Sequence, residues 1–190
     1  MSWLNKEELK KFKSVGENVL ISKDALIFGH ENIEIGSNIR IDAMNLILAS
    51  KGYLKIGSWV HLAAGSKYLC GGGIVIQDFA QVAFNCVLLS ASDDFSGRHL
   101  IGPTVVAAFT DVTIAAIVMG EASVLGVGSI LSPGTTLFRG AALGANSFTM
   151  KNQKLDENTI YAGSPAKPIK VRSKEHFDLM ALVRADKNTS

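Results

Sequence analysis

The densest group of side chains able to do acid–base chemistry lies between about residues 90 and 112. This segment carries two adjacent carboxylates, Asp93 and Asp94, followed by Arg98, His99 and Asp111. Neighbouring residues of an extended strand point to opposite sides. We therefore expect one carboxylate to meet a ligand or orient a base while the other holds the loop. The alternative is that both aspartates only cap turns.

Four histidines are candidates for a base that removes a proton from a hydroxyl, because the pKa of histidine lies close to neutrality. His30 and His176 are expected at the surface. His61 precedes the segment that leads into the acidic loop, and His99 lies within that loop. We favour His61 over His99 as the base and keep both as candidates. The alternative for either is a polar wall residue bonded to the backbone.

The segments that position these residues repeat every six residues. Such a period is neither that of a helix nor that of a simple strand, and it is typical of a solenoid. After short slips, the repeat places apolar residues at Val15, Ile21, Ile27 and Ile33; at Ile35, Ile41, Ile47 and Tyr53; at Ile56, Leu62, Tyr68 and Ile74; at Ile76, Val82 and Leu88; and at Met119, Leu125, Leu131, Leu137 and Leu143.

Small residues four places after each repeat residue sharpen this interpretation. They suit corners where the backbone turns tightly, and in the last five repeats they are Ser123, Ser129, Thr135, Ala141 and Ser147. Three faces of six residues predict a triangular coil of about 18 residues whose strands pair in parallel and bury one apolar column. A β-sandwich is the alternative, but it does not predict a strict period of six.

Composition excludes several classes of protein. The 190 residues, at 20.3 kDa, suit one domain with short appendages. A net charge of +2 is too balanced for a nucleic-acid binder. With 47% hydrophobic and 19% charged residues, disorder is excluded and an apolar interface is indicated.

Targeting and redox signals are absent from the sequence. The uncharged stretch from Ala122 to Phe138 falls short of a membrane span. The first residues lack the apolar run of a secretory signal, so we expect a cytoplasmic protein. Cys70 and Cys86 have neither disulfide-framework nor metal-ligand spacing and are expected to be small wall residues.

The two ends of the chain read as appendages to the repeat. Residues 1–14 contain Asn5 and Glu8 at capping-box spacing and predict a short helix over the first coil. Residues 15–150 form the repeat region, interrupted by the loop at about 90–112. Residues 151–190 predict an extended tail and a final helix that Ser173 caps.

The pattern resembles the hexapeptide-repeat acyltransferases, and most closely the sugar O-acetyltransferases of surface-polysaccharide biosynthesis. The resemblance covers most of the chain and is carried by ENIEIGSNIRID, VHLAAGSKYLCGGGI, SASDDFSGRHLIGPTV, VGSILSPGTTL and IYAGSPAKPIKVRSK. It implies a left-handed parallel β-helix, a homotrimer with sites between subunits, and an active site bordered by the acidic loop. The expected activity is transfer of an acetyl group from acetyl-CoA to a hydroxyl of a sugar or nucleotide-sugar.

The resemblance also implies where the donor lies. The pantetheine arm is expected along the late coils, where small residues allow close approach to backbone amides. The phosphates are expected near cations of the tail. The corresponding residues are Gly126, Gly128, Ala145, Ser147, Lys167 and Arg172, with Lys170 nearby. No metal is expected, and no nucleotide-binding glycine motif is present.

The sequence departs from the family pattern at two places. Related sequences often carry Lys-His where this chain has Glu121 and Ala122, and a second Asp where it has Ala43. An amine loses its proton with less help than an alcohol, so N-acetylation of an amino sugar remains an alternative. A degenerate scaffold and a zinc hydratase, which would need three converging histidines, are further alternatives.

Overall fold

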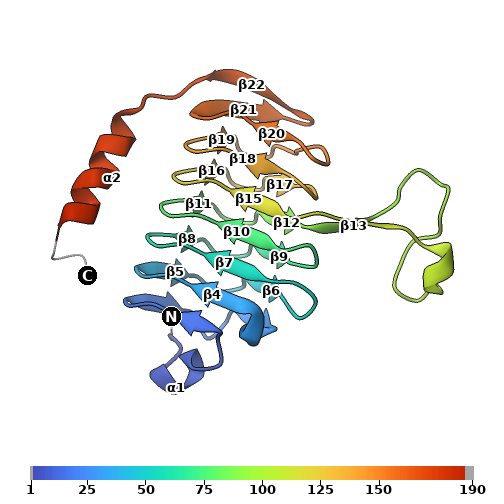
Figure 1. The fold of residues 1–190 in the computed structure, drawn as a ribbon, viewed down its shortest axis with the longest axis horizontal. Helices are drawn as coiled ribbons and strands as arrows, with labels where there is room; N and C mark the ends of the chain where they lie inside the picture. The colour runs from blue at the N-terminus through green and yellow to red at the C-terminus, as the bar shows by residue number, and fades with distance from the viewer. Residues whose placement is uncertain (1, 187–190) are drawn as a thin grey trace.

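The computed structural model describes residues 2–186, which form a parallel β-solenoid of about seven turns (Figure 1). Three parallel sheets make up the faces of a triangular prism, and each of the first five turns contributes one strand to every face. The predicted parallel solenoid with triangular coils is confirmed. No helix within residues 2–186 has the length and apolar character needed to cross a bilayer.

The strands of the three faces follow one another in chain order. Sheet 1 contains β1 (Ser14–Val15), β4 (Ile33–Ile35), β7 (Leu54–Ile56), β10 (Ile74–Ile76), β15 (Ile117–Met119), β18 (Thr136–Leu137) and β20 (Lys154–Leu155). Sheet 2 contains β2 (Val19–Ile21), β5 (Ile39–Ile41), β8 (His61–Leu62), β11 (Gln81–Val82), β16 (Val124–Leu125), β19 (Ala142–Leu143), β21 (Thr159–Gly163) and β22 (Ala166–Val171). Sheet 3 contains β3 (Leu26–Phe28), β6 (Leu46–Leu48), β9 (Lys67–Leu69), β12 (Val87–Leu89) and β17 (Ile130–Leu131).

The repeat residues point into the prism as predicted, with the exception of Tyr53, which is 38% exposed, while the next residue, Leu54, is buried in its place. On sheet 2, for example, Ile21, Ile41, Leu62, Val82 and Leu125 are all at most 1% exposed. The predicted corner residues Ser123, Ser129, Thr135, Ala141 and Ser147 are buried as well. Burying one aliphatic side chain contributes about 1.5–3 kcal/mol, so the inward column is the main source of stability.

The length of the coils differs from the predicted 18 residues in the first half of the chain. Ser14 pairs with Glu34, and Ile33 pairs with Leu54, which gives turns of 20 and 21 residues. Only later, where Val118 pairs with Thr136, do turns of 18 residues appear. The extra residues lie at the corner between sheets 3 and 1, where one turn folds into the 3₁₀ helix η1 (His30–Asn32).

The repeat also extends beyond residue 150, where the sequence predicted an extended tail. Strands β20 and β21 pair in parallel with β18 and β19 and form a seventh turn. Leu155 and Tyr161 continue the inward column and are buried. Thr149 occupies the preceding inward position, and because it is polar, the apolar repeat of six residues is interrupted there in the sequence. The antiparallel strand β22 then covers the last strand of sheet 2.

Short helices flank the solenoid at both ends. Helix α1 (Lys6–Leu9) has the predicted capping box between Asn5 and Glu8, although it is only four residues long. Helix α2 (Glu175–Ala185) folds back along the prism (Figure 1). The N-cap of this helix is Lys174, not Ser173 as predicted. Ser173 lies one residue before the N-cap, and its hydroxyl accepts a hydrogen bond from the Glu175 N–H.

Helix α2 is attached to the corner between sheets 1 and 2. Arg184 pairs with Asp78 at 3.1 Å and with Glu121 at 2.6 Å. Near the start of the helix, the Arg139 guanidinium lies 3.9 Å from the ring centroid of Phe177. These contacts come from three different turns, so the helix ties consecutive turns together along this corner.

Candidate functional site

The acidic loop projects from the corner between sheets 3 and 1 (Figure 1). Its two arms are β13 (Ala91–Asp93) and β14 (Val112–Ile114), which pair antiparallel to each other. The excursion between them contains the 3₁₀ helix η2 (Ala107–Phe109). Its exposed apolar side chains are Phe95, Leu100, Ile101, Val106, Phe109, Val112 and Ile114. Exposed apolar surface of this extent is typical of an interface.

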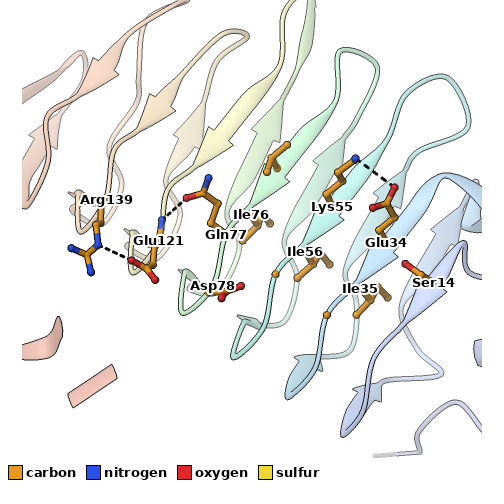
Figure 2. A pocket seen from close by; sticks show the side chains of 13 residues that line it. Ser14, Glu34, Ile35, Lys55, Ile56, Ile76, Gln77, Asp78, Glu121 and Arg139 are labelled. Carbon is orange, nitrogen blue, oxygen red and sulfur yellow. Dashed lines mark hydrogen bonds and ion pairs between the residues drawn. The ribbon is translucent and has the colours of Figure 1, made fainter. Parts of the chain in front are cut away.

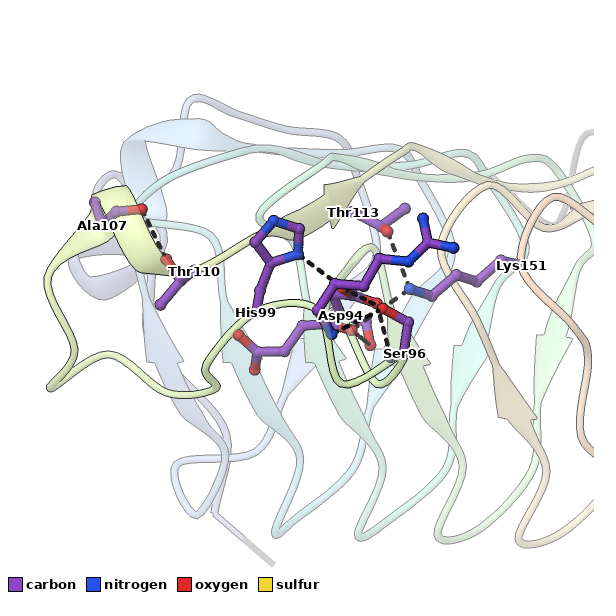
Figure 3. A network of polar contacts seen from close by, with 10 residues as sticks. Asp94, Ser96, His99, Ala107, Thr110, Thr113 and Lys151 are labelled. Carbon is purple, nitrogen blue, oxygen red and sulfur yellow. Dashed lines mark hydrogen bonds and ion pairs between the residues drawn. The ribbon is translucent and has the colours of Figure 1, made fainter.

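Asp94 lies at the centre of the polar network in this loop (Figure 3). Its carboxylate contacts Nδ1 of His99 at 2.8 Å and accepts hydrogen bonds from the backbone N–H and the hydroxyl of Ser96. The bond to His99, followed by those from Ser96, holds the pKa of Asp94 well below its usual range. Asp94 is therefore an ionised carboxylate at neutral pH, suited to holding a cationic or hydrogen-bond-donating ligand group.

Asp93 belongs to β13 itself, one residue before Asp94. Its carbonyl accepts a hydrogen bond from Lys151, which also donates to the hydroxyl of Thr113 (Figure 3). The possible ligand atoms of Asp94, His99 and Asp111 lie within 4.8 Å of one another. This group has the donor types of a cation site but contains one histidine, whereas the zinc hydratase alternative requires three.

His61 begins strand β8 on the outer side of sheet 2. Its Nε2 lies 2.7 Å from Oδ2 of Asp42, while Nε of Arg40 donates to Oδ1 of the same carboxylate at 2.7 Å. The Asp42 side chain is 6% exposed and the His61 side chain 40% exposed. Burial raises the pKa of Asp42, but the bonds from Arg40 and His61 outweigh it and leave this pKa lowered.

A shallow hollow of about 490 Å³ lies in front of His61. Arg40 and Gln81 flank His61 on the neighbouring strands of sheet 2. Trp59 also lines the hollow and stacks on Phe79, with ring centroids 4.7 Å apart. The hollow thus presents a histidine, a guanidinium and an aromatic ring on one face.

The sequence predicts that His61 lies together with Asp93 and Asp94, but within one chain the structure keeps them apart. His61 lies on sheet 2, whereas the loop leaves the opposite corner, between sheets 3 and 1 (Figure 1). Neighbouring turns are close along the prism axis, but side chains on different faces of the prism remain far apart. The two groups can share a site only if they come from two copies of the chain.

The predicted donor-binding residues lie in the late turns, and several have structural partners. A methyl group on Gly126 would overlap the backbone of Gly144 and Ala145 in the next turn, and Gly128 has a φ of +70°. The Ser147 hydroxyl bonds to Ala145 and Gly163. The stacking of turns therefore already requires these small residues, while the exposed Ala145 is free to meet a ligand.

The two predicted phosphate-binding cations on and after β22 differ in their surroundings. Arg172 donates to the carbonyls of Gly140 at 2.6 Å and Ala122 at 3.3 Å, so its guanidinium holds the tail against the corner. Lys167 and Lys170 are exposed and make no ion pair within residues 2–186. Of Lys167 and Arg172, only Lys167 has a charged group that is not engaged by other groups of the described chain and can contact a phosphate.

A further hollow of about 680 Å³ lies on sheet 1 and was not predicted (Figure 2). Its charged side chains are already paired. Glu34 binds Lys55 and Lys13, and Glu121 binds Arg139. Because these charges neutralise one another, the hollow offers no free cation to a phosphate and no free base.

The two cysteines are wall residues, as predicted. Both are buried, and burial raises the pKa of Cys70 to about 12 and also raises that of Cys86. Neither thiol is therefore available as a thiolate nucleophile at neutral pH.

Asp42 and Arg40 are the residues of the candidate site that sequence reasoning missed. The motif NIRID contains both, but their partner His61 lies 19 residues beyond Asp42. The only signal was that Asp42 follows an inward isoleucine at a place where the later repeats have Ala63, Ala83 or Gly126.

Comparisons with known proteins agree on one class of enzyme. No model of a protein family matches the sequence. The chain is 34% identical over 186 residues, 97% of its length and 96% of the other, to a dTDP-4-amino-4,6-dideoxy-D-glucose acyltransferase of Escherichia coli. The solved structure of AntD, an N-acyltransferase from Bacillus cereus, in complex with dTDP and 3-hydroxybutyryl-CoA has a TM-score of 0.92 at 36% identity and covers 98% of both chains.

A further structure shares the fold alone. It is that of a maltose O-acetyltransferase from Clostridium difficile, with a TM-score of 0.59 at 20% identity over 89% of this chain and 75% of the other.

Proposed function

The chain belongs to the hexapeptide-repeat sugar acyltransferases, and on this premise we propose that it acylates the amino group of a nucleotide-linked 4-amino-4,6-dideoxy sugar, with an acyl-CoA as donor. The observation that carries the proposal is the similarity over almost the full length to relatives that act on amino sugars. It favours the N-acyl alternative over the O-acetyl activity that the sequence suggested first.

Residue 122 supports an amine acceptor. Where related sequences often carry histidine, this chain has Ala122, which is 5% exposed and whose carbonyl is bound by Arg172. The neighbouring Glu121 is held by Arg139 and Arg184 and is not free to act as a base. An amine is a stronger nucleophile than a hydroxyl and needs less help to lose its proton, so an amine acceptor does not require a histidine at position 122.

The site is composed of two protomers of a homotrimer. One protomer supplies the loop with Asp93, Asp94 and His99, and the next supplies the face of sheet 2 with His61. Two observations support this arrangement: these groups lie on opposite sides of one chain, and the loop exposes a row of apolar side chains.

The reaction assigns a role to each group. The ionised Asp94, held by His99 and Ser96, orients the sugar amine. The amine nitrogen attacks the thioester carbonyl, the new N–C bond forms, and the C–S bond breaks. The amine proton passes to His61, from which the departing CoA thiolate takes it.

The first test is transfer to a matched pair of acceptors. With acetyl-CoA or 3-hydroxybutyryl-CoA as donor, we expect release of CoA thiol with dTDP-4-amino-4,6-dideoxyglucose and none with the 4-hydroxy analogue. Thiol release and mass spectrometry of the product measure this. Transfer to the hydroxyl analogue alone would contradict the proposal and support O-acylation. Binding of CoA without any turnover would support a catalytically degenerate scaffold.

The second test concerns the CoA phosphates. Lys167→Gln is expected to raise the KM for acyl-CoA roughly fivefold, since one phosphate contact contributes about 1 kcal/mol, and to leave kcat within about twofold. Lys10→Gln, at the opposite end of the solenoid, is the control and should change neither constant. An unchanged KM for Lys167→Gln would mean that Lys167 is a solvent-exposed residue of β22 that does not contact CoA.

A further inference from the structure

At the corner between sheets 2 and 3, Asp42 is a buried ionisable side chain that the fold does not require. The residues directly after the strands of sheet 2 form a column along this corner. From the first turn to the sixth they are Ser22, Asp42, Ala63, Ala83, Gly126 and Gly144. All except Asp42 are small and uncharged. Burying a carboxylate at this position costs free energy that serine, alanine or glycine avoids.

The position of Asp42 is explained by its contacts. Its two carboxylate oxygens are divided between two partners, with Oδ1 on Arg40 and Oδ2 on His61, both at 2.7 Å. His61 and Arg40 are register partners on adjacent strands, so the three side chains form one cluster on the outer side of sheet 2. The guanidinium of Arg40 also lies 5.6 Å from the ring centroid of Trp3, which restrains it further.

The protonation of the two ring nitrogens follows from this arrangement. An ionised carboxylate carries no hydrogen, so in the contact with Asp42 the imidazole must be the donor. Nε2 of neutral His61 therefore carries the hydrogen, and Nδ1 carries the lone pair. Within residues 2–186, Nδ1 has no hydrogen-bond partner, and the ring lines the open hollow of sheet 2.

We infer that Asp42 and Arg40 are positioning residues that hold His61 with hydrogen on Nε2 and present Nδ1 as the proton acceptor for the sugar amine. The inference rests on the proposed function, because it assigns the atom of His61 that takes the proton. That proton moves from the amine to Nδ1, and the resulting imidazolium keeps its Nε2–H on Asp42 until the CoA thiolate removes the proton from Nδ1.

The tautomer is tested directly by nitrogen-15 NMR of protein labelled at histidine. The His61 signals are assigned by their loss in His61→Gln. We expect the wild type to show hydrogen on Nε2 and a free Nδ1. A wild-type spectrum with hydrogen on Nδ1 overturns the inference. Because this readout needs no substrate, it stands even if no acyl transfer is found and the proposed function fails.

Asp42→Asn is the decisive variant. The amide has the shape of the carboxylate, but its NH₂ group can donate to Nε2 and so favours hydrogen on Nδ1. We expect kcat to fall by about 10²–10⁴, with the KM of each substrate within about twofold. The NMR signals of His61 should change to the other tautomer. A fully active Asp42→Asn enzyme overturns the inference.

Two further variants separate positioning from folding. Asp42→Ser places at this corner the residue that Ser22 has one turn earlier, so it should fold and still lose activity. Glu34→Gln removes a carboxylate that pairs with Lys13 and Lys55 on sheet 1, away from His61, and should remain active. If Asp42→Ser and Glu34→Gln lower kcat equally, the effect of Asp42 is general and the positioning role is overturned.

Discussion

Replacing His61 by alanine is expected to lower kcat for acyl transfer by about 10²–10⁴, because a positioned general base contributes a rate factor of this size. The hollow of sheet 2 would lose the only imidazole that lines it. The affinity for acyl-CoA should stay close to that of the wild type, since the proposed donor site lies in the late turns. Steady-state kinetics and calorimetric titration with CoA measure the two quantities.

His99→Ala is the matched comparison, because His99 is the second histidine in contact with a carboxylate. Its loss should have a smaller effect on kcat, since Asp94 keeps its bonds from Ser96. An inactive His99 variant beside an active His61 variant would make the loop histidine the base. If both variants stay active, the amine loses its proton without a histidine, and Asp94 alone orients the acceptor.

Leu125→Ala is expected to lower the free energy of unfolding by about 2–5 kcal/mol, the range for deleting a fully buried leucine side chain. Leu125 is fully buried in β16, in register with Val82 of the turn before and Leu143 of the turn after. The cavity therefore interrupts the apolar column in the middle of the solenoid. Urea denaturation followed by circular dichroism measures the change.

Leu182→Ala is the control for this variant. Leu182 is 67% exposed on α2, so its truncation should change the free energy of unfolding by less than about 0.5 kcal/mol. Equal destabilisation by the two variants would mean that the inward column is not the main source of stability.

The architecture of the wall could be predicted from the sequence because the period of six is imposed locally. Most inward positions carry an aliphatic side chain and most corners a small one, so Leu131 and Ser129 follow a rule that neighbours along the chain reveal. The capping box of Asn5 and Glu8 is equally local, since its partners are three residues apart.

Two parts of the wall were not visible in this local pattern. The longer early turns add residues at the corner between sheets 3 and 1, where irregular backbone breaks the count of six. The seventh turn was missed because the polar Thr149 stands in the inward column. Its hydroxyl is accommodated by a bond to Thr135 inside the prism, a contact that only the stacking of turns provides.

The candidate site divides in the same way. The sequence by itself determined which side chains are able to do the chemistry, namely His61, His99, Asp93 and Asp94, because residue type fixes acid–base properties. It also located the loop, since the loop interrupts the repeat. The short contact between Asp94 and His99 joins residues five apart, within reach of local reasoning.

The tertiary structure alone decided the partners of these groups. Asp42 meets His61 because one turn of the prism returns the chain to the same face, and Arg172 meets Ala122 because the tail folds back over an earlier corner. The triangular section likewise places His61 and the acidic loop on opposite sides of one chain. Hydrogen bonds and charge pairing depend on distances of a few ångströms between turns, and the register of the turns, rather than any local pattern, sets those distances.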